Sequence, residues 1–136
     1  MRPGSGVKRD AQAYELPEWP PPIAGGKAGG KRLVIVGAGP GGLFAAYVLA
    51  AAGMRPLVLE RGQATAERVR QVEAFFNGDE HDSESNVLFG DGGAGAFSDG
   101  KLTWRGKDAR GRYVLGVMAG HGAPEDILYM AKPHVG

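Results

Sequence analysis

The sequence predicts an α/β fold in which two short parallel strands flank one helix and form an incomplete parallel sheet. Residues 33–36 (Leu-Val-Ile-Val) are an apolar run without alternation, which is typical of a strand buried on both faces. A glycine-rich turn at 37–42 and an apolar helical segment at 43–52 follow, and a second apolar run occupies 56–59. A strand, a turn, a helix and a strand in this order are the pattern of a Rossmann-like βαβ unit.

The helix of this unit has a clear start and stop in the sequence. Residues 43–52 are apolar at every position and rich in Ala and Leu, which favour helix, and Gly53 provides the stop. A second, amphipathic helix is predicted over 65–76, where charged residues separate apolar residues at helical spacing, namely Val69, Val72, Phe75 and Phe76. Residues 77–100 show no periodicity, and a loop of this length inside a domain is usually functional or disordered.

The C-terminal part predicts two more helices. The apolar residues of 113–118 indicate a helix that ends at Gly120 or Gly122, and Pro124 is placed to begin a last helix that reaches Met130. Residues 1–31 are predicted to be a Pro/Gly-rich linker, because they hold three consecutive prolines and two glycine pairs.

Composition excludes several classes of function. The chain has 136 residues and a net charge of +1, so it has no whole-chain attraction for nucleic acid or an anionic membrane. It contains no cysteine, which excludes disulfides, thiolate metal sites and a cysteine nucleophile. The longest apolar run, residues 41–54, is too short to span a membrane, and no signal peptide follows the first residues. We therefore expect a cytoplasmic protein of one domain that binds neither nucleic acid nor membrane.

The turn after the first strand has the pattern G-x-G-x-x-G, formed by Gly37, Gly39 and Gly42. It follows a strand and opens a helix, and Glu60 ends the next strand, as in dinucleotide-binding units. A pyrophosphate must approach bare backbone N–H groups at the helix N-terminus, which explains the glycines. Glu60 can accept hydrogen bonds from ribose hydroxyls and would repel a 2′-phosphate, so NADP is disfavoured here. FAD and NAD share this half-site, and the motif leaves both open.

Two further features extend this candidate site. Arg61 and Arg68 follow the acidic residue, where their guanidinium groups could bind phosphate or ribose oxygens, although Arg68 is equally compatible with a solvated helix residue. Residues 90–101 hold five glycines, and the Gly92-Gly93 pair would let backbone N–H groups approach a ligand. Apolar residues around this second glycine loop, such as Phe89 and Phe97, should tie it to a core.

Four segments resemble the uncharacterised bacterial FAD-dependent dehydrogenases: 36–46, 59–62, 84–87 and 97–102. The resemblance covers 32–136 and implies the N-terminal, truncated part of a glutathione-reductase-like FAD domain. It implies that Gly37, Gly39, Pro40, Gly41 and Gly42 bind the FAD pyrophosphate and Glu60 the adenosine ribose. It further implies that Arg61 and Arg68 flank that ribose and phosphate, that Gly92 and Gly93 approach the pyrophosphate or flavin, and that Lys101 lies near the isoalloxazine ring.

The function that the resemblance implies is the FAD-binding portion of an oxidoreductase that moves a hydride through the flavin. NAD(P)H is a possible partner through the rest of such a protein, and the fragment alone is expected to be inactive. A non-catalytic FAD- or NAD-binding regulatory module is the alternative. No catalytic residue and no metal site is predicted, because the three histidines have no spaced partner: His81, His121 and His134. The absence of cysteine disfavours a disulfide reductase.

Overall fold

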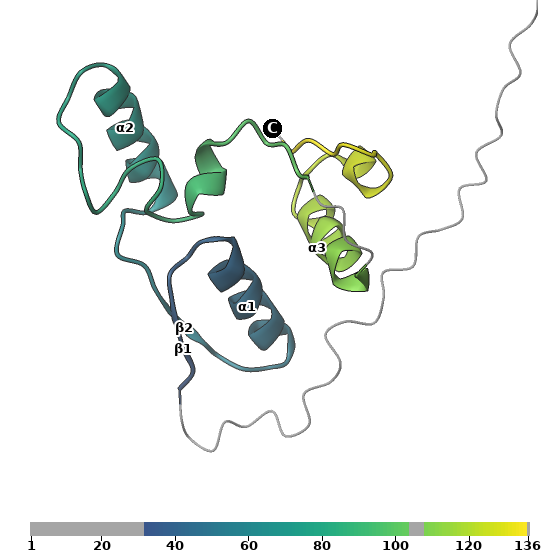
Figure 1. The fold of residues 1–136 in the computed structure, drawn as a ribbon. Helices are drawn as coiled ribbons and strands as arrows, with labels where there is room; N and C mark the ends of the chain where they lie inside the picture. Colours follow the sequence, from purple (N-terminus) through teal and green to yellow (C-terminus); the bar gives the residue numbers. More distant parts are fainter. Residues whose placement is uncertain (1–31, 104–107, 136) are drawn as a thin grey trace, which may run out of the picture.

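The computed structural model describes residues 32–103 and 108–135 (Figure 1). The predicted linker, residues 1–31, lies outside the described residues. The elements follow in the order β1 (Val34–Val36), α1 (Pro40–Ala51), β2 (Leu57–Leu59), α2 (Thr65–Phe76), the 3₁₀ turn η1 (Ala94–Phe97), α3 (Ala109–Gly120) and the 3₁₀ turn η2 (Glu125–Leu128). In the view of Figure 1, α2 and α3 lie on opposite sides of α1.

The two strands pair in parallel, which confirms the predicted βαβ unit. Ile35 pairs with Val58, and the amide of Leu57 donates a hydrogen bond of 2.8 Å to the carbonyl of Leu33. The helix α1 packs against both strands. The expectation that the strands are buried on both faces is wrong for the described residues: Val36 is 85% exposed, and Leu59 is also exposed. The physical reason is that α1 is the one element packed closely against these strands in the described ranges.

Helix α1 begins three residues earlier than its apolar run. Gly39 is the N-cap and Pro40 is the first helical residue, where its fixed φ suits a helix and its missing N–H costs nothing. Hydrophobicity alone placed the start at Leu43, but the Leu43 amide already donates to the Gly39 carbonyl at 2.9 Å. Gly53, with φ of +76°, ends the helix as predicted.

Helix α2 has the predicted bounds, but of its predicted apolar residues only Val72 is buried. Its buried residues are Arg68 and Val72, which are four positions apart and therefore share one side of the helix. Phe76 is 74% exposed, and Phe75 lies beside His81 with the ring centroids 5.5 Å apart. The loop after α2 covers the side that carries Arg68, so the most deeply buried side chain of this helix is charged.

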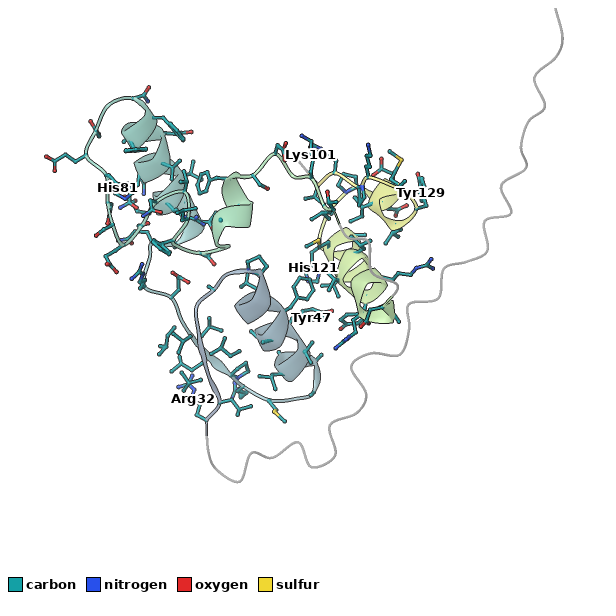
Figure 2. The ribbon with its side chains drawn as sticks, in the orientation of Figure 1. Arg32, Tyr47, His81, Lys101, His121 and Tyr129 are labelled. Carbon is teal, nitrogen blue, oxygen red and sulfur yellow. The ribbon has the colours of Figure 1, made fainter. Side chains whose placement is uncertain are left out.

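The C-terminal elements form a separate small packing unit. Helix α3 is capped by Asp108, which accepts a hydrogen bond from the Arg110 amide, and it ends at Gly120, as predicted. The predicted last helix is wrong in extent, because η2 is a single turn, Glu125–Leu128, that buries Ile127. Figure 2 shows Tyr47 of α1 pointing toward His121, the residue that follows α3; their rings meet edge to face at 5.7 Å.

Candidate functional site

The first glycine loop (residues 37–42) needs glycine for two different reasons. Gly37 has φ of +98°, which side-chain-bearing residues rarely adopt. A Cβ on Gly42 would lie 1.9 Å from the carbonyl oxygen of Gly37, so α1 lies directly on the turn that precedes it. Gly41 has open space in the direction of a Cβ. The loop therefore exposes bare backbone at the start of α1.

The first turn of α1 is suited to bind an anion. The first amides of a helix have no partner within the helix, and the helix dipole places partial positive charge there. Pro40 lacks an N–H, which leaves the amides of Gly41 and Gly42 as the donors of this turn. Glycine at both positions keeps side chains away from these donors. A phosphate group fits this arrangement without further protein groups.

Glu60 lies at the end of β2 and bonds to both neighbouring turns. Its Oε2 accepts a hydrogen bond of 2.6 Å from the Ala38 amide, inside the first glycine loop, and its Oε1 accepts one of 3.0 Å from the Gly62 amide. These bonds, that from Ala38 first, lower the pKa of the Glu60 carboxyl below its ordinary value of 4.5. The carboxylate is therefore charged near neutral pH, and each oxygen retains a lone pair for a ribose hydroxyl.

The first part of the second glycine loop, residues 90–93, rests against the first glycine loop. Gly90, Gly92 and Gly93 all have positive φ. The Gly92 amide donates a hydrogen bond of 2.9 Å to the Ala38 carbonyl, and a Cβ on Gly93 would lie 3.1 Å from the Cα of Gly39. The region from 77 to 100 is thus not structureless: it contains these turns and η1. Two loops far apart in sequence meet at the N-terminus of α1.

Arg68 lies beneath the second glycine loop. Its side chain is fully buried, and its Nε donates to the Asn86 carbonyl at 2.9 Å. Its Nη1 donates to the carbonyls of Asp91 and Gly93, both at 2.7 Å. The Phe97 ring lies over the guanidinium carbon at 4.7 Å. The structure therefore places Arg68 near the glycine loops, while a direct contact with ribose or phosphate stays a prediction.

Two polar residues that shape this loop were not among the predicted site residues. The Asn86 side chain accepts hydrogen bonds from the amides of Leu88 and Phe89 at 2.9 and 3.2 Å and donates one of 2.8 Å to the Asp82 carbonyl. Ser85 accepts a hydrogen bond of 3.2 Å from the Gln63 amide. Both are buried. Their position just before a glycine run is the signal that could have identified them, because Asn and Ser side chains form such turns.

Arg61 and Lys101 occupy more exposed positions. The Nε of Arg61 lies 3.5 Å from Glu84, and its guanidinium carbon lies 4.3 Å from the centre of the Phe89 ring. Arg61 is thus beside the second loop. Lys101 lies between η1 and α3 (Figure 2), where its ammonium pairs with Asp99 and its backbone forms a bridge with His134. Its contacts are with the C-terminal segment, and its predicted place near a flavin ring stays a prediction.

Within 32–103 and 108–135, no three His, Asp or Glu side chains gather closely enough to hold a metal ion. In the same residues, no helix has the length and apolar character needed to cross a membrane.

Comparison with known proteins agrees with this architecture. Residues 35–98 match a family described as an NAD(P)-binding Rossmann-like domain. This segment begins within β1 and contains α1, β2, α2, the first glycine loop and residues 90–93. The fold is therefore a Rossmann-like α/β fold with a parallel sheet, as predicted. The family description supports a dinucleotide-binding domain and leaves the roles of individual residues as predictions.

Similar proteins include one bacterial protein and several snake proteins. An uncharacterized protein of Clostridium beijerinckii is 52% identical over 105 residues, which are 77% of this chain and 20% of that protein. L-amino-acid oxidases of Sistrurus catenatus edwardsii and Crotalus adamanteus are 60% identical over 40 residues, or 29% of this chain and 8% of each oxidase. The chain thus aligns with about a fifth of the length of the bacterial relative and a smaller part of the oxidases.

Proposed function

We propose that this chain binds FAD and forms the dinucleotide-binding part of an oxidoreductase. The observation that carries the proposal is the meeting of three features at one residue, Ala38. The Ala38 amide donates to Glu60, and its carbonyl accepts from Gly92. The acidic residue and both glycine loops are thereby held together at the start of α1. The similarity to an NAD(P)-binding Rossmann-like domain supports the same class of ligand.

The residues fit two parts of an adenosine diphosphate group, the pyrophosphate and the ribose. Gly39, Gly41 and Gly42 present backbone without side chains at the N-terminus of α1, where a pyrophosphate would lie. Glu60 is ionised and oriented by two amides, so it would accept hydrogen bonds from the adenosine ribose. Gly92 and Gly93 would form the second wall of the pyrophosphate site. In this scheme the chain binds and orients the cofactor.

Two observations favour FAD over NAD as the ligand. The second glycine loop extends the site beyond the strand–turn–helix unit that both cofactors share. The similarity to proteins named as L-amino-acid oxidases points the same way, because reaction with oxygen is within the chemistry of flavins and not of nicotinamides. When bound, the flavin would accept and donate hydride.

A dinucleotide site for NAD is the second candidate, and the description of the matched family as NAD(P)-binding is what favours it. The Glu60 carboxylate would repel a 2′-phosphate, so NAD fits this site better than NADP. A module of this kind could hold its ligand without turnover, as in the alternative derived from the sequence.

The absorbance spectrum of the purified full-length protein tests the proposal. Flavin bands in the visible region that persist through gel filtration are the expected result. Anaerobic addition of NADH or NADPH should then bleach these bands, since a flavin that moves a hydride can be reduced. A protein that binds NAD but has no visible absorbance would contradict the FAD assignment. A bound flavin that reductants and candidate substrates leave oxidised would favour the regulatory module.

A further inference from the structure

The helix α2 buries an arginine where an ordinary amphipathic helix buries an apolar residue. The Arg68 side chain is fully inaccessible, yet within the described residues its hydrogen bonds go to backbone carbonyls and none goes to a carboxylate. Removing a guanidinium group from water costs several kcal/mol, and charge-assisted hydrogen bonds offset part of that cost. A buried charge of this kind indicates a positional role that an apolar side chain could not perform.

The acceptors of Arg68 define what it positions. The Asn86 carbonyl lies before the second glycine loop, and the carbonyls of Asp91 and Gly93 lie within it. A Cβ on Gly90 would lie 2.6 Å from the Arg68 Cδ, so the loop passes directly over the arginine side chain. The planar guanidinium donates in several fixed directions, which a lysine ammonium cannot reproduce. Arg68 therefore determines the path of the loop.

This path matters because the loop reaches the first glycine loop. The Gly92 amide bonds to the Ala38 carbonyl at 2.9 Å, and the Gly93 backbone touches Gly39. A short chain of contacts thus runs from Arg68 through the second loop to the residues at the N-terminus of α1. Each link is backbone or a fully buried side chain, so a change at Arg68 should alter the geometry of the first loop.

We propose that Arg68 is a positioning residue that holds the second glycine loop against the pyrophosphate site and makes no contact with the cofactor. The proposal rests on the proposed function, and it replaces the direct contact that the family resemblance implies. The atom available for a direct contact is Nη2, which is buried and has no hydrogen-bond partner among the described residues. Direct contact is therefore the alternative that the experiment must separate.

A double-mutant cycle in the full-length protein separates the two roles. Arg68→Lys is combined with Gly93→Ala, whose Cβ would meet Gly39 and Pro40 at 3.1 and 3.2 Å and so displaces the loop. We expect Arg68→Lys alone to raise the dissociation constant of FAD about tenfold, and by less than about twofold when Gly93→Ala is present. An equal effect in both backgrounds would mean that Arg68 acts directly and would overturn the proposal.

The control is Arg70→Met, which removes an exposed arginine of the same helix that pairs with Glu67. It should change the dissociation constant by less than about twofold, as expected for a surface ion pair. Should Arg68→Lys fail to fold, Phe97→Leu removes the ring over the guanidinium and keeps every hydrogen bond of Arg68. It should raise the dissociation constant about threefold. No change with Phe97→Leu in that case would count against the proposal.

Hydrogen exchange of the cofactor-free protein provides a second readout that does not depend on binding. Arg68→Lys should abolish protection of the Gly92 amide while residues of α3 exchange as in the wild type, because the effect is confined to the loop. Unchanged protection of Gly92 would refute the positioning role. If the wild-type protein binds no dinucleotide, the proposed function fails, and the exchange measurement still decides whether Arg68 orders the loop.

Discussion

Gly42 lies so close to Gly37 that a Cβ on Gly42 would stand 1.9 Å from the Gly37 carbonyl oxygen and 3.4 Å from the Ile35 side chain. This contact joins the end of β1 to the start of α1. It explains why the third glycine of the motif serves packing, whereas the earlier ones serve the turn and the ligand. The effect of Gly42 on stability and the effect of the earlier glycines on ligand binding can be measured separately.

Gly42→Ala should lower the free energy of unfolding by about 1–3 kcal/mol, because a backbone carbonyl would have to move to admit the methyl group. Gly41→Ala is the matched control, since nothing lies within 4 Å of its Cβ position. Replacing glycine with alanine there should leave the stability equal or raise it by up to about 1 kcal/mol. Chemical denaturation of both variants checks this, and equal losses would contradict the close contact.

Gly39→Val should abolish dinucleotide binding, and it should change the free energy of unfolding much less than the free energy of binding. The Cβ of Gly39 would meet Gly93 at 3.9 Å, an ordinary contact distance, so a side chain can fit locally. The branched side chain would nevertheless occupy space that the pyrophosphate needs. Titration with FAD measures the effect. Binding retained within about threefold, roughly 0.65 kcal/mol, would exclude this loop as the pyrophosphate site.

Glu60→Gln should weaken FAD binding by about 1–2 kcal/mol, because the ribose hydroxyls lose a charged acceptor and keep a neutral one. Isothermal titration with FAD and with adenosine diphosphate ribose tests whether the loss belongs to the adenosine half. Both ligands should lose the same free energy. An unchanged dissociation constant would mean that the carboxylate does not face the ribose.

Glu60 should also make the stability of the cofactor-free protein depend on pH. Its pKa in the folded state is lowered, chiefly by the Ala38 amide, so the ionised form is stabilised relative to the unfolded chain. That contribution is present above the ordinary pKa of 4.5 and is lost as the pH falls through the lower, folded-state pKa. The stability difference between wild type and Glu60→Gln should therefore be constant above about pH 5.5 and shrink below about pH 4.5. A constant difference down to about pH 3 would contradict these hydrogen bonds.

Asn86→Ala should lower the free energy of unfolding by about 2–3 kcal/mol, because the amides of Leu88 and Phe89 lose their acceptor. Asn86→Asp keeps an acceptor for both amides and loses the bond to the Asp82 carbonyl, so its loss should be smaller at neutral pH. Denaturation curves of the two variants give the comparison. Both variants lose the bond to the Asp82 carbonyl, so the reverse order would contradict the role given to the hydrogen bonds from the Leu88 and Phe89 amides.

The sequence by itself determined the parts of this protein that depend on neighbouring residues. Apolar runs, helical spacing and the G-x-G-x-x-G pattern were sufficient to predict β1, β2, both bounds of α2 and the end of α3. Local patterns were less reliable at element ends, where α1 begins at Pro40 and η2 is one turn. These differences arise because capping and short-range hydrogen bonds, and not hydrophobicity, decide where a helix begins and ends.

The tertiary structure alone decided how the two glycine loops and Arg68 are arranged. Spacing along α2 predicted an apolar face of Val69, Val72, Phe75 and Phe76. Of these only Val72 is buried, and it shares the packed face with Arg68. A charged side chain can be buried when backbone carbonyls from a distant loop accept its hydrogen bonds, and no local pattern encodes those carbonyls. The contact between Gly39 and Gly93 has the same cause: it exists only after residues from two loops far apart in sequence have been brought together.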